Sequence, residues 1–124
     1  MKTSMRVNYA IVFVSDMRRS VSFYRDTIGL PLRFESPHWT EFETDGATLA
    51  LHLAESSPPI SADNGTRAGS CRPGLRVPSL DEFHQRMNER EVRCLQEPTD
   101  VFGSRVAQYA DPDGLTISVG ESRP

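Results

Sequence analysis

The side chains best equipped for chemistry in this sequence fall on two strands that we predict to be neighbours. The strands flank the pair Asp45-Gly46, which is a strong signal for a two-residue hairpin turn. Such a turn sets Trp39 opposite His52 and places Glu41 on the same face. An indole that can stack on a flat ring, a carboxylate and a proton-exchanging imidazole would then share one wall.

The alternation of side chains along strands places further polar groups on this face. In the strand of His52 the leucines occupy the opposite face, so His52 should point into a concavity together with Ser118 of the last strand. The first strand contributes Tyr9, and the matching position 63 residues later is Arg72. A buried arginine needs a carboxylate such as Glu41 or an anionic ligand, and by the same parity Arg76 could take the place of Arg72 in this role.

Each of these residues also has a purely structural interpretation. His52 could be a half-buried strand histidine, and Trp39 could be a core residue or a dimer contact. Tyr9 could pack with a satisfied hydroxyl, Glu41 could belong to a polar strand face, and Arg72 could be solvated. The sequence leaves both interpretations open for all five.

The pattern of apolar residues predicts the elements that hold these side chains. Met17, Val21, Tyr24 and Ile28 recur at helical spacing, and Gly29 stands where a left-handed cap would end that helix. A second helix should open at Pro78-Ser79 and run to about residue 90. The strand that follows it, over residues 92–96, should be closed by Pro98. The predicted strands are 6–14, 32–35, 38–44, 47–53, 71–77, 92–96, 104–110 and 115–119.

The chain also repeats itself. Val14-Ser15-Asp16-Met17 lies over Val77-Pro78-Ser79-Leu80, and 44–52 lies over 112–120 with a shared Asp-Gly, Thr and alternate aliphatic residues. The order of elements predicts an α+β domain over 1–124, made of two βαβββ modules at about 6–53 and 71–121. They would form a curved mixed sheet around a cavity, with the helices outside. The polar segment 54–70 is either a plain linker or a flap beside a site.

Two motifs carry a family resemblance. Val-Ser-Asp-Met-Arg-Arg-Ser-Val-Ser-Phe-Tyr-Arg-Asp-Thr-Ile-Gly-Leu, residues 14–30, resembles the strand-to-helix entry of the vicinal oxygen chelate superfamily. That superfamily includes glyoxalase I, extradiol dioxygenases, fosfomycin-resistance enzymes and bleomycin-resistance proteins. Asp111-Pro112-Asp113-Gly114 resembles its second signature. The resemblance covers about residues 6–121 and implies the glyoxalase/bleomycin-resistance fold, commonly as a homodimer, but it does not specify a reaction.

The resemblance also indicates where a metal would bind. Ligands of the family's metal enzymes usually stand on the first and last strands of each half, at places that correspond to Tyr9, Ala50, Arg72 and Ser118. Alanine has no donor atom, arginine is a fixed cation, and neutral tyrosine and serine replace imidazole or carboxylate poorly. We therefore expect no metal and no cofactor. A slip in strand register leaves His52 and Glu41 as an alternative, displaced metal site.

Charge and composition disfavour several classes of partner. A net charge of −3 over 124 residues offers no positive field to nucleic acid or to an anionic membrane. The longest hydrophobic stretch, Tyr9 to Val14, is too short to span a bilayer, and no signal-peptide cleavage site follows it. Cys71 and Cys94 lack CxxC spacing, so we expect two reduced thiols in a cytoplasmic protein.

The sequence therefore favours a metal-free protein that binds and sequesters a small molecule, aromatic or partly anionic. The predicted ligand-binding residues are Tyr9, Trp39, Glu41, His52, Arg72 and Ser118. An enzyme is the alternative: a glyoxalase-like lyase, an isomerase or a dioxygenase-type enzyme, with a displaced metal at His52 and Glu41 or with His52 as a metal-free base. Ser118 has no His and Asp partners at recognisable spacing, so we predict no nucleophile. The third hypothesis is an interaction domain with an empty cavity.

Overall fold

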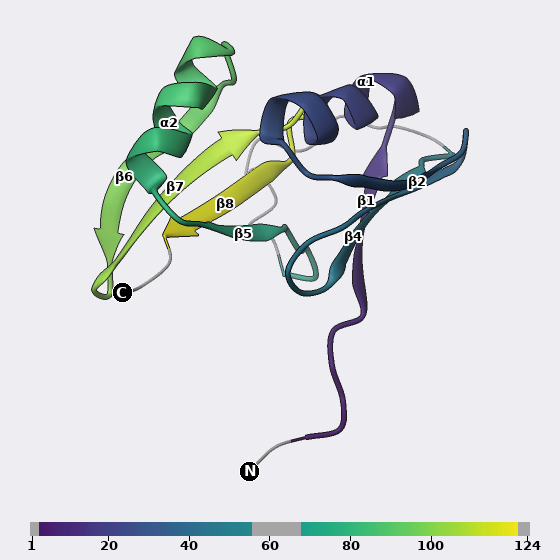
Figure 1. Cartoon of the computed structure of the whole chain (residues 1–124), viewed down its shortest axis with the longest axis horizontal. Helices are drawn as coiled ribbons and strands as arrows, with labels where there is room; N and C mark the ends of the chain where they lie inside the picture. Colours follow the sequence, from purple (N-terminus) through teal and green to yellow (C-terminus); the bar gives the residue numbers. More distant parts are fainter. Residues whose placement is uncertain (1–2, 56–67, 122–124) are drawn as a thin grey trace. The chain divides into compact units, whose positions relative to one another are not determined.

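The computed structural model describes residues 3–55 and 68–121, so most of the predicted linker lies outside the described residues. The chain divides into two compact units, Met1–Ser57 and Pro58–Pro124, which we call module 1 and module 2. Each module has the element order βαβββ and its own four-stranded mixed sheet (Figure 1). The predicted α+β class and the two predicted βαβββ modules are confirmed.

Module 1 pairs its first strand with its last. Its sheet has the order β1-β4-β3-β2, in which β1 and β4 run parallel and the other pairs are antiparallel. The elements are β1 (Tyr9–Val14), α1 (Met17–Ser22), the π-helical η1 (Phe23–Ile28), β2 (Leu32–Glu35), β3 (Trp39–Phe42) and β4 (Thr48–Leu53).

Both ends of the helical segment of module 1 have recognisable caps, and the end at Gly29 is the one that the sequence predicts. The Asp16 carboxylate caps α1 by accepting a hydrogen bond of 3.1 Å from the Arg19 amide. The segment widens to π geometry in η1 and ends at Gly29, whose φ of +102° lies in the left-handed region. Tyr24 and Ile28 are buried, as their helical spacing predicts.

Module 2 repeats the topology with the sheet order β5-β8-β7-β6. The helix begins after Ser79, whose hydroxyl accepts a hydrogen bond from the Glu82 amide, while Glu121 accepts a bond of 3.0 Å from the Leu80 amide. The elements are β5 (Gly74–Val77), α2 (Leu80–Glu89), β6 (Cys94–Val101), β7 (Ser104–Ala110) and β8 (Thr116–Glu121).

Two predicted strand limits in module 2 are wrong. The first strand begins at Gly74 and not at residue 71, because Pro73 has no N–H to donate to a ladder. Strand β6 continues through Pro98 to Val101 instead of closing there. Pro98 is tolerated because β6 is an edge strand and its register shifts between Gln96 and Thr99.

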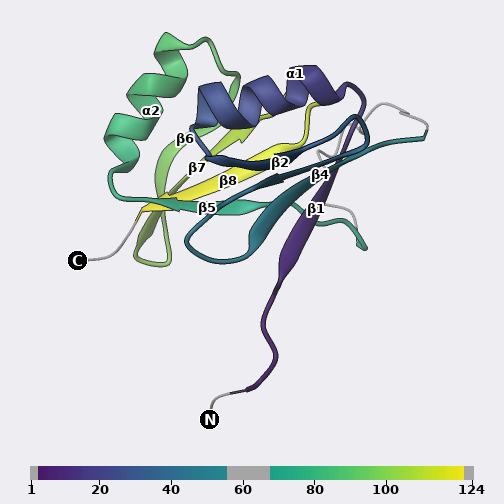
Figure 2. The same ribbon diagram turned by 45° about the vertical axis from the view of Figure 1, so that its right-hand side comes forward.

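Each helix covers one face of the sheet in its own module (Figure 2). In β1, Val12 and Val14 are buried while the alternate residues Tyr9, Ile11 and Phe13 are exposed, so this strand presents an apolar outer face. In module 2 the core includes Phe83, Tyr109 and Ile117. Among the described residues, no helix has the length and apolar character that crossing a lipid bilayer requires.

Candidate functional site

The register of β3 on β4 is the one that the Asp45-Gly46 turn predicts. Trp39 lies opposite His52, and Glu41 lies opposite Ala50. On the other side of β4, β1 sets Tyr9 opposite Thr48 and Phe13 opposite His52. Three strands of module 1 therefore place Tyr9, Trp39, Glu41 and His52 on one face.

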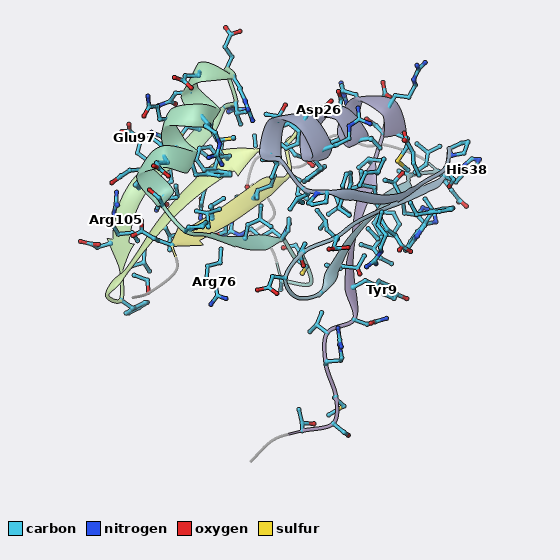
Figure 3. All side chains as sticks on the ribbon, in the orientation of Figure 1. Tyr9, Asp26, His38, Arg76, Glu97 and Arg105 are labelled. Carbon is cyan, nitrogen blue, oxygen red and sulfur yellow. The ribbon has the colours of Figure 1, made fainter. Side chains whose placement is uncertain are left out.

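Four aromatic rings on this face contact one another, and we call them the aromatic patch: Tyr9, Phe13, Trp39 and His52. The Tyr9 and Trp39 ring centroids lie 6.1 Å apart at 88°, and those of Trp39 and His52 lie 6.1 Å apart at 86°. Phe13 lies 5.3 Å from the His52 ring. Tyr9 is 49% exposed and Phe13 is 63% exposed, so the patch is open to solvent (Figure 3 labels Tyr9 on β1).

Glu41 fixes the Trp39 ring and pairs with a cation that sequence reasoning missed. Its Oε2 accepts a 2.8 Å hydrogen bond from Trp39 Nε1, and its Oε1 accepts bonds of 3.3 and 3.1 Å from Arg33 Nε and Nη2. Arg33 also donates to the Thr48 hydroxyl. The bond from Trp39, followed by the bond from Arg33, lowers the pKa of the Glu41 carboxyl. Glu41 is therefore an ionised residue that holds Trp39 in position.

His52 has one nitrogen engaged and one available. Its Nδ1 lies 2.8 Å from the Leu53 carbonyl oxygen. Because a carbonyl only accepts, Nδ1 carries the proton, and Nε2 of the neutral ring carries a lone pair. His52 and Phe13 also line an open hollow of about 350 Å³ with Leu53, Ala54 and Glu55. This volume is at the lower end of the range typical of small-molecule sites.

The remaining two predicted residues belong to module 2. Ser118 is half-buried and lies between Gly74 and Gln108 in the sheet. Arg72 is exposed and precedes β5, so the prediction that it projects from that strand is wrong. Arg76 does lie on β5, opposite Gly120, and extends away from α2 (Figure 3). That Arg72 and Ser118 join the other four residues at one site stays a prediction.

The residues at the family's metal positions do not fit a metal. Ala50 is fully buried and has no donor atom. In the alternative metal site at His52 and Glu41, both Glu41 oxygens already accept hydrogen bonds, and His52 would be the sole additional metal ligand. Within residues 3–55 and 68–121, no three His, Cys, Asp or Glu side chains group closely enough to hold a metal ion.

Comparison with known proteins identifies the family. The profile described as Glyoxalase/Bleomycin resistance protein/Dioxygenase superfamily matches residues 6–119. The phenazine antibiotic resistance protein EhpR of Enterobacter agglomerans is 30% identical over 115 residues, which cover 90% of this chain and 88% of EhpR. The metallothiol transferase FosB of Staphylococcus saprophyticus is 27% identical over 111 residues, covering 87% and 71% of the two chains.

The fold agrees with solved structures. The crystal structure of a glyoxalase/dioxygenase from Nostoc punctiforme superimposes with a TM-score of 0.82 at 21% identity, covering 96% of this chain and 92% of that one. The two modules, the motifs at residues 14–30 and 111–114 and the profile match over 6–119 lead to the same assignment. The chain belongs to the glyoxalase/bleomycin resistance protein/dioxygenase superfamily.

Proposed function

We propose that this protein binds and sequesters a flat aromatic small molecule without using a metal. The observation that carries the proposal is the aromatic patch of module 1. Its rings contact one another on an exposed strand face, where burial by the protein's own helix does not account for them. Contiguous exposed apolar surface is characteristic of interaction sites.

The geometry of the patch suits a planar ligand. Trp39 stands nearly perpendicular to both Tyr9 and His52, so a flat ring can stack on one aromatic face and meet the edge of another. The bond from Trp39 to Glu41 fixes the indole before a ligand arrives. A pre-oriented ring loses little conformational freedom on binding, which favours affinity.

One of the two named relatives, EhpR, supports a role in resistance to a small molecule. EhpR is named for resistance to phenazine antibiotics, and a phenazine is a planar system of three fused rings. FosB is named a metallothiol transferase. At the positions that correspond to the metal ligands of family enzymes, this chain has Tyr9, Ala50, Arg72 and Ser118. These residues do not fit a metal, which favours a function like that of EhpR over one like that of FosB. We assign stacking on the ligand to Trp39 and Tyr9.

Equilibrium dialysis against phenazine, read by its absorbance, tests the proposal. Stacking on an aromatic ring contributes about 1–3 kcal/mol, so Trp39→Ala should weaken binding about fivefold or more. Phe102→Ser is the control, because Phe102 is a fully exposed aromatic residue at the turn between β6 and β7 and does not belong to the aromatic patch. It should leave binding unchanged. Phenazine recovered unaltered by mass spectrometry supports sequestration, whereas a converted product would favour the enzyme alternative. No binding of phenazine to the unaltered protein would contradict the proposal.

We further propose that the protein acts in the cytoplasm as a homodimer. Cys71 and Cys94 are free thiols, which suits a reducing compartment. Met5 and Val7 precede β1, are apolar and are 80% and 72% exposed, and a second copy of the chain that covers them would remove them from water. Light scattering should give twice the chain mass of 13.9 kDa. A mass of one chain at micromolar concentration would contradict the dimer.

A further inference from the structure

Most polar groups on the patch face of module 1 already satisfy one another. The Trp39 N–H and the Arg33 guanidinium both donate to Glu41, and Arg33 also donates to the Thr48 hydroxyl. The Arg33–Glu41 ion pair cancels the two formal charges on this face. A ligand that stacks on Trp39 therefore meets its ring and not its N–H.

One polar atom beside Trp39 that retains hydrogen-bonding capacity is Nε2 of His52. Among the described residues it has no hydrogen-bond partner, whereas Nδ1 lies 2.8 Å from the Leu53 carbonyl. That bond fixes the tautomer and makes Nε2 an acceptor. The Tyr9 hydroxyl also lies on this face, but it both donates and accepts, so it does not select between ligand donors and ligand acceptors.

We propose that the patch selects planar aromatic ligands that carry an edge N–H or O–H donor, which His52 Nε2 accepts. This inference rests on the proposed function, since it concerns a ligand stacked on the same patch. It narrows the ligand class from flat aromatics in general to amino- or hydroxy-substituted ones. An unpaired acceptor beside a bound ring would oppose ligands that lack the donor.

Two probes of matched shape test this selectivity. 2-Aminophenazine carries a donor, and 2-methylphenazine replaces that amino group with a methyl group of similar size. Relative to His52→Phe, the unaltered protein should favour the amino compound by a factor of about three to ten, which is the effect of one neutral hydrogen bond. The phenylalanine keeps a ring in place but removes the acceptor. Comparing the two proteins cancels the different hydrophobicity of the probes.

Two further variants keep the test decisive if His52→Phe folds poorly. His52→Gln offers an amide oxygen as acceptor and should retain part of the preference. Tyr9→Phe removes the Tyr9 hydroxyl and should leave the preference for 2-aminophenazine intact.

Four results separate the inference from the proposed function. Loss of the preference in His52→Phe, with both probes still bound, supports the inference. Equal preference in the unaltered protein and in His52→Phe overturns it while the proposed function stands. The same holds if the preference disappears only in Tyr9→Phe. If neither probe binds the unaltered protein, the proposed function fails and the inference fails with it.

Discussion

The indole Nε1 of Trp39 donates a 2.8 Å hydrogen bond to Oε2 of Glu41, two residues further along β3. Glu41→Ala removes this bond and leaves Arg33 without its carboxylate. We expect phenazine affinity to fall about three- to tenfold, because the indole must then be ordered at the moment of binding. Equilibrium dialysis gives the affinity, and the fluorescence anisotropy of Trp39, the only tryptophan, gives its mobility.

Glu41→Gln is the conservative control for this prediction, since its amide oxygen can still accept from the indole. It should recover most of the affinity lost in Glu41→Ala. Unchanged affinity in Glu41→Ala would mean that the Trp39 ring is held by other contacts.

Tyr109 in module 2 should make the protein sensitive to alkali. Burial raises the pKa of Tyr109 to about 12, with a smaller contribution from Cys94. The pKa in the unfolded chain is about 10, so the stabilising effect is complete below that pH. It is lost as pH rises through 12, because the folded state must then release a proton that it holds tightly.

Tyr109→Phe cannot ionise and should therefore lose less stability than the unaltered protein between about pH 10 and 12. At neutral pH it should be about 1 kcal/mol less stable, because the 2.8 Å hydrogen bond with His84 Nδ1 is gone. Urea unfolding across this pH range measures both effects. Parallel alkaline curves for the two proteins would show that another group is responsible.

Ser20 is a position where substitution should stabilise the protein. It is fully buried on α1, and within the described residues its hydroxyl has no hydrogen-bond partner. Ser20→Ala removes the unsatisfied group and introduces the best helix former, so the free energy of unfolding should rise by about 1 kcal/mol. Ser22→Ala on the same helix should bring no such gain, because the exposed Ser22 hydroxyl donates to Asp26. A loss of stability in Ser20→Ala would indicate a bound water at that hydroxyl.

The turn between β6 and β7 carries a strained and exposed residue. Phe102 has a φ of +50° and Gly103 a φ of +81°, the combination for which turns of this kind favour Asn-Gly. Phe102→Asn should raise the melting temperature by about 4 °C, since asparagine tolerates the left-handed conformation. Gly103→Ala should lower it. If Phe102→Asn melts earlier, Phe102 makes a stabilising contact that its complete exposure does not suggest.

The register of β3 on β4, which positions the patch, could be predicted by counting residues outward from the turn. A two-residue turn at Asp45-Gly46 leaves a single pairing, and it sets Trp39 opposite His52 as observed. The fold class followed from the repeat of strand, helix and hairpin. These features depend on local chemistry and on alternation, which are visible along the chain.

The role of Arg33 could not be predicted, because it depends on an irregularity. The pairing of β2 with β3 shifts between Leu32 and Phe34, and Arg33 reaches Glu41 across that shift. A bulge changes which face a residue occupies, and period-two reasoning assumes that none occurs. The position of Arg72 could not be predicted for a related reason: Arg72 precedes Pro73 and lies outside β5, so the alternation of side chains along that strand does not apply to it.

In each module the first strand along the chain pairs with the last, and this pairing has a consequence for synthesis. In module 2, β5 pairs only with β8, which is an interior strand of the sheet although it is the last strand of the module along the chain. Strand β5 therefore has no partner strand while residues 78–115 are translated. A translational pause before Thr116 would prolong that interval and expose strand edges to other nascent chains.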